Sequence, residues 1–367
     1  MRPAVAVFTD TYLPTVNGVT YTIETWRDRW RARGGRMDVV YPKSGHVPGD
    51  REFPVFSLPF PFYDGFRIAG PLVPDTVRDV DLVHSHTPFG IGLGGYRLAR
   101  RSEKPFVASF HTPTSEYANY LSDGLATVVS RAADRYENAY LGRADHVITP
   151  SPSARDRLLD RGVDTPVTVV SNGIDTDRFR PTDGPAFRER YDLSGTLVGY
   201  TGRHGFEKRL SDVITACEGL DVTVVFGGDG PARADLEAQA AESDVDVRFL
   251  GFLDREELPA FYTALDVFAH PSPVETEGLV ALEAAACGTP VVAVDAGGLA
   301  DTVRDGETGV HYPPGDIGAF RAAIGRALDD RSSLHETCLA RRDAMSVEHA
   351  VDTLEAVYDG ILDGANT

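Results

Sequence analysis

Short apolar runs alternate with longer stretches of helical pattern along the whole chain. The first half contains VAVF, MDVVY, DLVHSH, PFVASFH, HVITPS and VTVVS, and the second half contains TLVGYTG, VTVVFGG, VRFLG, DVFAHP and PVVAVDA. Runs of this length predict buried strands, and their regular alternation with helices is typical of parallel sheets covered on both faces. The sequence therefore predicts an α/β protein with two Rossmann-like, doubly wound parallel-sheet domains that face a cleft.

The boundary between the two domains is expected in residues 171–185, SNGIDTDRFRPTDGP, where Pro, Gly and Asp replace the strand pattern. We expect an N-terminal domain over 1–175 and a C-terminal domain over 176–346, with a helix over about 347–367 that packs back onto the first domain. The 367 residues, of which 42% are hydrophobic and 25% charged, are sufficient for two globular cores.

Polar residues and glycines gather where the predicted strands end. Open parallel sheets bind ligands beyond the carboxyl ends of their strands, so a binding site is expected at these positions. The residues found there are Gly18, His86, His111, Ser151, Arg203, Gly228 and His270.

The composition indicates the cellular compartment in which the protein is expected. Cys217, Cys287 and Cys338 are too few and too scattered for a disulfide framework or a thiolate metal cage, which is typical of a reducing interior. The N-terminus predicts a strand rather than a signal peptide, and no run approaches the roughly 20 apolar residues of a membrane span. We therefore expect a cytoplasmic protein, either free or peripheral on the inner face of the cell membrane.

The net charge limits the kinds of partner that the protein is expected to bind. A net charge of −19 disfavours nucleic acid, and it is unevenly distributed: residues 1–170 hold 20 basic and 19 acidic side chains, net +1, whereas 171–367 hold 16 and 36, net −20. Only Lys43, Lys104 and Lys208 are lysines, and this acidic, lysine-poor composition resembles that of proteins from salt-loving organisms. The two halves are expected to face different partners.

The apolar stretch PVETEGLVALEAAACGTP, residues 273–290, carries two glutamates, Glu275 and Glu283. It predicts a short buried helix over 279–287 that ends at Gly288, with Glu283 as its only charged residue. An unpaired buried carboxylate costs on the order of several kcal/mol, so Glu283 either pairs with an arginine in the core or faces a cavity where a ligand supplies hydroxyl donors. Both alternatives are open on this pattern alone.

Several motifs resemble those of glycosyltransferase family 4. The most specific is the E-x7-E element of Glu275 and Glu283, and it is accompanied by TGRHGFEKRL (201–210), FGGDGP (226–231) and SNGIDTDRF (171–179). The resemblance runs nearly end to end and implies a retaining enzyme of the GT-B type. Such an enzyme moves a hexose from a UDP- or GDP-linked sugar, binds the acceptor with its N-terminal domain and the donor with its C-terminal domain, and needs no cofactor or metal.

The resemblance also assigns residues to the donor's diphosphate. Arg203 and Lys208 follow the strand TLVGYTG and would bring a guanidinium fork and a point charge to the phosphates as negative charge builds on the leaving group. The backbone N–H groups of Gly278, Leu279 and Val280, at the start of the short helix, would face the same phosphates.

Other residues are assigned to the sugar and the nucleoside. Glu283 would accept hydrogen bonds from the ribose hydroxyls, and Glu275 would lie beside the hydroxyls of the donor sugar. Gly18 would let the N-terminal backbone approach the donor. His111 would hydrogen-bond the sugar near its anomeric centre and orient it, while the donor's own phosphate oxygen takes the acceptor proton. The catalytic set is thus Arg203, Lys208, Glu275 and His111, and the donor-binding set is Gly18, Gly278, Leu279, Val280 and Glu283.

Three further features bear on the site. His84 and His86 alternate on one predicted strand, so only one is expected to face the cleft, in a structural or acceptor-side role. Glu277 stands before Gly278 where the family usually has an aromatic residue, which leaves the identity of the donor sugar open. Three D-x-D triplets are attributed to the abundance of acidic residues rather than to a metal site: Asp79/Asp81, Asp175/Asp177 and Asp244/Asp246.

Motifs of the first half resemble the branch of the family that glucosylates diacylglycerol and related membrane lipids. They are FTDTYLPTVNGV (8–19), FPVFSLPFPFYDGFRIAGP (53–71), HSHTPFGIG (84–92) and SFHTPTSEYANYL (109–121). This resemblance implies a lipid-linked acceptor, either a glycerolipid or a polyprenyl- or dolichol-linked glycan.

Two basic clusters, TWRDRWRARGGR (25–36) and YRLARRSEK (96–104), would dock the N-terminal half on an anionic membrane surface. Trp26 and Trp30 follow helical spacing with Ile23, so they either touch the membrane or, as the favoured alternative, form the core face of their helix. The arginines are expected on the outer face in both cases.

Other classes of protein share this architecture. An NAD-dependent oxidoreductase is disfavoured because TDTYLPTVNG, after the first strand, lacks the G-x-G-x-x-G turn. A two-lobed solute-binding protein would need an export signal. The remaining alternatives to a lipid-directed transferase are a sugar-nucleotide epimerase and a glycosyltransferase with a soluble acceptor.

Overall fold

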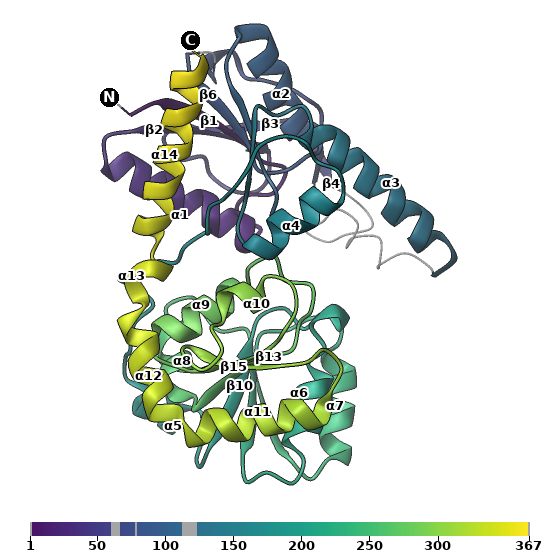
Figure 1. Ribbon diagram of the computed structural model, residues 1–367, viewed down its shortest axis with the longest axis vertical. Helices are drawn as coiled ribbons and strands as arrows, with labels where there is room; N and C mark the ends of the chain where they lie inside the picture. The colour runs from purple at the N-terminus through teal and green to yellow at the C-terminus, as the bar shows by residue number, and fades with distance from the viewer. Residues whose placement is uncertain (1, 60–66, 78, 112–122, 366–367) are drawn as a thin grey trace. The chain divides into compact units, whose positions relative to one another are not determined.

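The computed structural model describes residues 2–59, 67–77, 79–111 and 123–365. The chain divides into two compact units, one formed by Met1–Asn172 together with Ala350–Thr367, and the other by Gly173–His349. Each unit is built around a parallel sheet with helices on its faces (Figure 1).

The first unit contains a seven-stranded sheet in the order β3-β2-β1-β6-β7-β8-β9, in which all neighbouring strands are parallel. Its strands are β1 (Ala4–Phe8), β2 (Arg36–Pro42), β3 (Glu52–Val55), β6 (Leu82–Ser85), β7 (Phe106–Ser109), β8 (His146–Thr149) and β9 (Val167–Val169). An antiparallel pair, β4 (Ser57–Pro59) and β5 (Arg67–Ala69), stands apart from this sheet. The helical elements are α1 (Gly18–Ala32), η1 (Asp75–Val77), α2 (Gly90–Ser102), α3 (Asp123–Leu141) and α4 (Pro152–Asp160).

The second unit contains a six-stranded sheet in the order β12-β11-β10-β13-β14-β15, again with parallel neighbours. Its strands are β10 (Leu197–Thr201), β11 (Thr223–Gly227), β12 (Asp246–Gly251), β13 (Val267–His270), β14 (Val291–Val294) and β15 (Gly309–Tyr312). Its helical elements are α5 (Gly184–Arg190), η3 (Phe206–Lys208), α6 (Ser211–Cys217), α7 (Arg233–Glu242), α8 (Leu258–Ala264), α9 (Leu279–Ala286), α10 (Leu299–Thr302), α11 (Ile317–Asp329), α12 (Arg331–Ala340) and α13 (Arg342–Met345).

The two sheets confirm the predicted fold class, and each has one point where the strand order reverses. In the first sheet this point lies between β1 and β6, and in the second it lies between β10 and β13. The loops that follow such a pair of strands run to opposite sides, which opens a crevice at the carboxyl end of the sheet. Residues after β10 and β13 are therefore brought together although they are far apart in sequence.

The final helix, α14 (Val347–Ala365), belongs to the first unit from Ala350 onwards and contacts the end of α1 (Figure 1). Arg33, directly after α1, pairs with Asp352 at 2.5 Å, and the rings of Trp30 and Tyr358 lie 5.5 Å apart in an edge-on contact. Trp26 and Trp30 are fully buried. The core-face alternative for these two tryptophans is therefore confirmed.

Candidate active site

Lys208 and Glu275 meet at the reversal point of the second sheet. The chain leaves β10 at Thr201 and makes the short turn η3, which ends at Lys208, and the Lys208 Nζ lies 2.5 Å from Glu275 Oε1. Burial alone would raise the pKa of Glu275, but the positive charge and hydrogen bond of Lys208, together with the nearby His270, outweigh it and lower that pKa to about 2. The two predicted catalytic residues thus form a charged pair at neutral pH.

Arg203 lies on the same loop, nearer to the strand. It forms an ion pair with Glu207, and 41% of its side chain is exposed. The structure places Arg203 on the loop predicted for it.

His270 borders the same pair and was given no role by the sequence analysis beyond its place at a strand end. It is the last residue of β13, is fully buried, and its Nε2 lies 3.7 Å from Glu275 Oε1. Within the described residues neither ring nitrogen has a hydrogen-bond partner. Burial lowers its pKa to about 4, so a neutral imidazole with unsatisfied nitrogens adjoins the ion pair.

Glu283 lies on α9, which confirms the predicted buried helix. The hydroxyl of Tyr262 donates a hydrogen bond of 2.6 Å to Glu283 Oε2. Burial raises the pKa of Glu283 to about 7, against the opposing effects of this hydrogen bond and of Arg255 and Arg178. No ion pair of Glu283 with an arginine occurs in the part of the chain that the structure describes, and its hydrogen bond there is with Tyr262.

Gly278 sets the start of α9. It has φ +86°, and a Cβ added there would lie 2.5 Å from Leu299 Cδ2, so the position favours glycine on both counts. The helix hydrogen bonds begin with Ala281 N to Gly278 O, so the N–H groups of the first turn, including those of Leu279 and Val280, have no partner within the helix.

Two glycines that the sequence analysis missed fix the loop of Glu275. A Cβ on Gly297 would lie 2.7 Å from the Glu275 carbonyl oxygen, and one on Gly298 would lie 2.3 Å from the backbone of Thr276. The Gly298 N–H donates to the Glu275 carbonyl at 2.7 Å. The pair of glycines after the strand PVVAVDA was the signal in the sequence that could have pointed to this close approach.

In the first unit His111 follows β7 and lies against His86. The His86 Nδ1 and His111 Nε2 are 2.8 Å apart, and the two rings are nearly parallel with centroids 5.1 Å apart. The ring of His84 lies 4.2 Å from that of His86, and both contact Trp26. The rings of His84 and His86 therefore lie on the same side of the chain rather than on alternate sides, because residues two apart on an extended segment share one face.

Gly18, the other predicted residue of this unit, is the first residue of α1. Asn17 caps the helix by accepting from Thr20 N at 3.0 Å, so Gly18 N–H belongs to the first turn. Gly18 and His111 belong to the first unit, and the remaining predicted site residues belong to the second.

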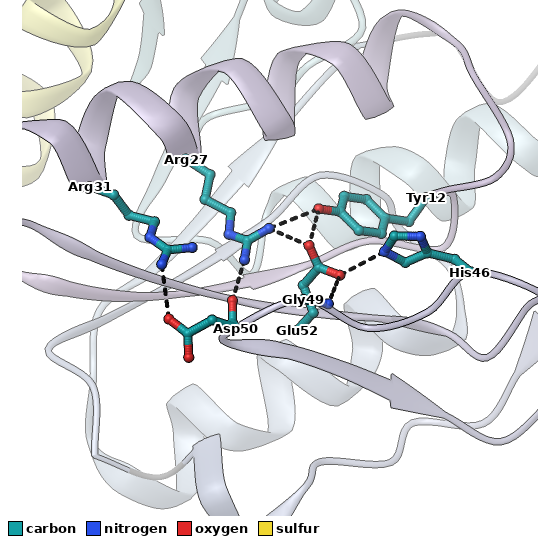
Figure 2. Close-up of polar contacts among 7 residues, drawn as sticks. All are labelled: Tyr12, Arg27, Arg31, His46, Gly49, Asp50 and Glu52. Carbon is teal, nitrogen blue, oxygen red and sulfur yellow. Dashed lines mark hydrogen bonds and ion pairs between the residues drawn. The ribbon is translucent and has the colours of Figure 1, made fainter.

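The basic cluster of α1 is largely neutralised inside the first unit (Figure 2). Arg27 is buried and pairs with Glu52, which also accepts from the hydroxyl of Tyr12. Arg31 pairs with Asp50 at 2.9 Å. The prediction that these arginines lie on the outer face is therefore wrong for Arg27, because α1 turns that side toward the acidic start of β3.

The second basic cluster is different. Arg97, Arg100 and Arg101 on α2 are exposed, and none of them forms an ion pair with any residue that the structure describes. Exposed apolar side chains occur on and beside the β4–β5 pair: Phe56, Leu58, Ile68 and Leu72. Residues 60–66 and 112–121, which belong to two of the lipid-branch motifs, lie outside the described residues.

Two features are absent from the described residues. No helix among them is long and apolar enough to cross a membrane. No group of three or more His, Cys, Asp or Glu among them could hold a metal ion.

Both units are similar to known glycosyltransferases. Residues 16–178 match the model of Glycosyltransferase Family 4, and residues 187–342 match that of Glycosyl transferases group 1. The chain is 31% identical over 344 residues to a GDP-mannose-dependent alpha-mannosyltransferase of Mycolicibacterium smegmatis, covering 88% of this chain and 87% of that protein. It is 28% identical over 368 residues to the alpha-monoglucosyldiacylglycerol synthase of Streptococcus pneumoniae, covering 92% and 81%.

One further relative and one solved structure are also similar to this chain. A 2-deoxystreptamine glucosyltransferase of Streptomyces kanamyceticus is 35% identical over 311 residues, covering 77% of this chain and 78% of that protein. Among solved structures, Anabaena HepE in complex with UDP and glucose superposes with a TM-score of 0.79 at 21% identity, covering 97% of this chain and all of that one. At that identity the likeness establishes the fold.

Proposed function

Since this chain belongs to glycosyltransferase family 4, whose members transfer sugars from nucleotide-sugar donors, we propose that it moves a hexose from a UDP- or GDP-sugar to a lipid-linked acceptor at a membrane surface. The family assignment makes it a retaining hexosyltransferase of the GT-B type. The donor's base, the sugar and the acceptor are parts of the proposal.

One observation carries the donor side of the proposal: the Lys208–Glu275 pair lies at the reversal point of the second sheet, beside unsatisfied nitrogens of His270. A single carboxylate holds the Lys208 ammonium there. A diphosphate brings more negative charge than Glu275 does, so Lys208 can turn to the phosphates and release Glu275 to the sugar hydroxyls.

The other residues complete this arrangement. Arg203 adds its guanidinium to the diphosphate, and the first-turn N–H groups of Gly278, Leu279 and Val280 point to the same charge. Glu283, whose pKa lies at about 7, gains donors from the ribose hydroxyls. These groups stabilise the departing nucleoside diphosphate, which is the main requirement of the reaction.

The first unit supplies the groups at the reacting carbon. His111 orients the donor sugar near its anomeric centre, and Gly18 lets the backbone approach the donor. The donor's own phosphate oxygen takes the proton of the acceptor hydroxyl on the face that the leaving group vacates, so no side-chain base is required. Glu277, which is buried before Gly278, stands where sugar selectivity would be set.

The donor part is tested by a calorimetric binding screen of UDP- and GDP-sugars, run at high salt because of the acidic composition. We expect one nucleotide class to bind, and we expect Lys208→Met to weaken binding of the nucleoside diphosphate. Product analysis with and without a lipid acceptor then separates the alternatives. An epimerase would change the sugar without any acceptor, and a transferase for soluble acceptors would ignore the lipid.

The acceptor part is supported by the contrast between α1 and α2. The arginines Arg27 and Arg31 of α1 are paired internally, whereas Arg97 and Arg101 of α2 are exposed and, among the described residues, unpaired. Each basic residue near an anionic surface contributes on the order of 1 kcal/mol. The docking surface is thus assigned to α2 rather than to α1.

The segment at the end of β5 adds exposed apolar side chains beside the arginines of α2. A Cβ on Gly90 would collide with the carbonyl oxygen of Ala69 at the end of β5, at 1.8 Å, and a Cβ on Gly94 would lie 3.2 Å from the backbone of Pro71. Positions 90, 94, 97 and 101 share one face of a helix, so Arg97 and Arg101 extend the side on which this segment packs. Exposed Ile68 and Leu72 lie on that segment. Apolar groups beside unpaired arginines fit the interface of an anionic bilayer.

Co-sedimentation with phosphatidylglycerol vesicles over a salt series tests this assignment. Replacing Arg97 and Arg101 by Gln is expected to weaken binding about tenfold or more at low salt. The matched double variant Arg31→Gln/Arg33→Gln removes the same charge from α1 and should bind as the wild type does. Equal losses in the two variants, or no binding of the wild type at low salt, would favour a soluble acceptor.

A further inference from the structure

We infer that His270 is a positioning residue for Glu275: when a diphosphate draws Lys208 away, His270 donates a hydrogen bond to the Glu275 carboxylate and keeps it an acceptor for the sugar hydroxyls. The inference rests on the proposed roles of Lys208 and Glu275 at the donor. It starts from a buried imidazole whose two nitrogens have no hydrogen-bond partner among the described residues, and whose Nε2 lies 3.7 Å from Glu275 Oε1. Buried polar groups are normally satisfied, so this ring is suited to gain a partner when the site is loaded.

The chemistry of the two groups fixes the direction of this hydrogen bond. An ionised carboxylate has no proton to give, so Glu275 can only accept. Burial lowers the pKa of His270 to about 4, so its ring is neutral and carries one N–H. The negative charge of Glu275 lies on the Nε2 side and favours the tautomer with the proton on that nitrogen. His270 can therefore donate to Glu275, and it can do so as a neutral group.

Glu275 needs such a donor once Lys208 leaves it. At present the charge and hydrogen bond of Lys208, together with His270, outweigh burial and hold the pKa of Glu275 at about 2. Glu283 is a buried glutamate of the same unit without a lysine, and burial raises its pKa to about 7 although the Tyr262 hydroxyl donates a hydrogen bond to it. A diphosphate would raise the pKa of Glu275 further through its negative charge. One hydroxyl donor is therefore not enough to keep a carboxyl of this unit ionised at neutral pH.

The ring of His270 is held in place beside this carboxylate. His270 is the last residue of β13, and it is enclosed by two aromatic rings that meet it edge-on. The ring centroid of Tyr200 on β10 lies 5.4 Å from that of His270, and the centroid of Phe268 lies 6.1 Å away. Because these contacts fix the ring, a small movement of the Glu275 side chain is enough to close the distance to Nε2.

The titratable groups packed around Glu275 come from β10, from the loop and turn after it, and from β13. In the described elements they are Tyr200, Arg203, Glu207, Lys208 and His270. Tyr200 stays neutral because burial raises the pKa of its hydroxyl, and Arg203 and Glu207 form an ion pair with each other. With the lysine on the phosphates, His270 is the described titratable group that lies beside Glu275 and can donate to it.

A matched pair of variants tests the inference in the full-length chain. His270→Gln places an amide N–H near the position of Nε2, whereas His270→Met has nearly the same length and no donor. The acid limb of kcat should lie about one pH unit higher in His270→Met than in the wild type, the shift expected from one lost hydrogen bond to a charged group. His270→Gln should keep the wild-type limb, and at pH 9 both variants should keep kcat within about threefold of the wild type.

His311→Met is the control for the loss of a histidine near a carboxylate. His311 Nδ1 lies 3.8 Å from Asp295 Oδ1, but the side chain of Asp295 is 60% exposed. Water can replace the imidazole there, so kcat and its acid limb should match those of the wild type. The hydroxyl of Ser272, which also lowers the pKa of Glu275, is present in every variant.

A second measurement needs no substrate. Lys208→Met removes the lysine permanently and so reproduces its departure from Glu275. Carbon-13 spectra of glutamate-labelled protein then give the pKa of Glu275, whose signal is assigned by its loss in Glu275→Gln. In the Lys208→Met background, His270→Met should give a Glu275 pKa about one unit or more above that given by His270→Gln.

The outcomes separate this inference from the proposed function. The same acid limb in the Met and Gln variants of His270, or the same Glu275 pKa in the two double variants, would overturn the role of His270. A fall of kcat that is equal at all pH values would also overturn it, because the ring would then only pack. Wild-type turnover in Lys208→Met would instead contradict the proposed function, while the spectra would still decide on His270. If His270→Met fails to fold, His270→Asn replaces it, because its shorter amide does not reach Glu275.

Discussion

Two ion pairs, Arg27–Glu52 in the first unit and Lys208–Glu275 in the second, differ in how many hydrogen bonds their carboxylates accept. Glu52 Oε1 accepts from Arg27 and from the Tyr12 hydroxyl, and Glu52 Oε2 accepts from His46 Nε2 and from Gly49 N, both at 2.8 Å (Figure 2). Every acceptor position of this carboxylate is occupied.

Glu275 has a different environment. Lys208 approaches Oε1, and the nearby ring nitrogens of His270 have no partner among the described residues. Buried polar groups are normally satisfied, and the exceptions occur where a ligand or water completes the site. A saturated carboxylate therefore holds a fold together, whereas a cation with one carboxylate and unsatisfied neighbours is suited to exchange partners when a ligand binds.

The largest effect should come from breaking the saturated pair. Arg27→Met leaves Glu52 buried without its cation, so the free energy of unfolding should fall by about 3–5 kcal/mol. Urea denaturation measures this loss, and turnover of the folded fraction should stay near that of the wild type. Arg31→Met, which breaks the exposed pair with Asp50, is the control and should cost about 1 kcal/mol or less. Equal losses would mean that burial does not distinguish these pairs.

Breaking the second pair should affect rate more than stability. Lys208→Met removes charge from the departing diphosphate, so kcat should fall about 10²- to 10³-fold, and Arg203→Ala should lower it about 10²-fold. Glu275 is left without its cation but can take up a proton, because its side chain is 17% exposed. Steady-state kinetics with saturating donor measure the loss. Lys104→Met, which lies just after α2, is the control and should have the activity of the wild type. A Lys208→Met enzyme with wild-type activity would contradict the role of Lys208 at the phosphates.

Local pattern was enough to predict most of the fold. Each predicted apolar run contains a strand, and the run after Gly278 forms α9, because buried parallel strands and short apolar helices are visible in consecutive residues. The strands that were not predicted are β3, β4, β5 and β15, which are short, lie at sheet edges or outside the main sheets, and include Pro54. Such strands depend on neighbours that the local pattern does not contain.

Contacts between distant residues could not be predicted in the same way. Lys208 and Glu275 were both identified by motif, but their contact across 67 positions results from the strand order β10-β13. Arg27 was expected on the surface, because nothing in the residues around it indicates that Glu52, 25 positions later, turns toward it. The sequence shows which residues are charged, but which of these charges pair with each other depends on how the chain packs.

The pH dependence of stability should separate the glutamates further. Because the pKa of Glu283 is raised from 4.5 to about 7 in the folded state, its contribution is complete below pH 4.5 and is lost as pH rises through 7. Between about pH 5.5 and 8 this loss amounts to about 2 kcal/mol.

Glu283→Gln does not titrate, so its free energy of unfolding should lack this decline. Urea denaturation at several pH values measures the difference between the variant and the wild type. Glu237→Gln, at an exposed pair with Arg233, is the control and should keep the wild-type slope. Parallel curves for wild type and Glu283→Gln would contradict the raised pKa and would return Glu283 to an ionised, paired role.

The smallest effect concerns the backbone that carries the second site. Gly278→Ala and Gly306→Ala both place alanine at positive φ, +86° and +73°, and each should lose about 1–2 kcal/mol of unfolding free energy for that reason. Only at Gly278 does the new Cβ meet another group, Leu299 Cδ2 at 2.5 Å, whereas Gly306 has open space within 4 Å. The Leu299 side chain and the positive-φ backbone at the start of α9 must then adjust to the new methyl group, so nucleoside diphosphate affinity should fall in Gly278→Ala and stay unchanged in Gly306→Ala. Calorimetric titration of both variants tests this, and equal affinities would mean that the first turn of α9 does not bind the phosphates.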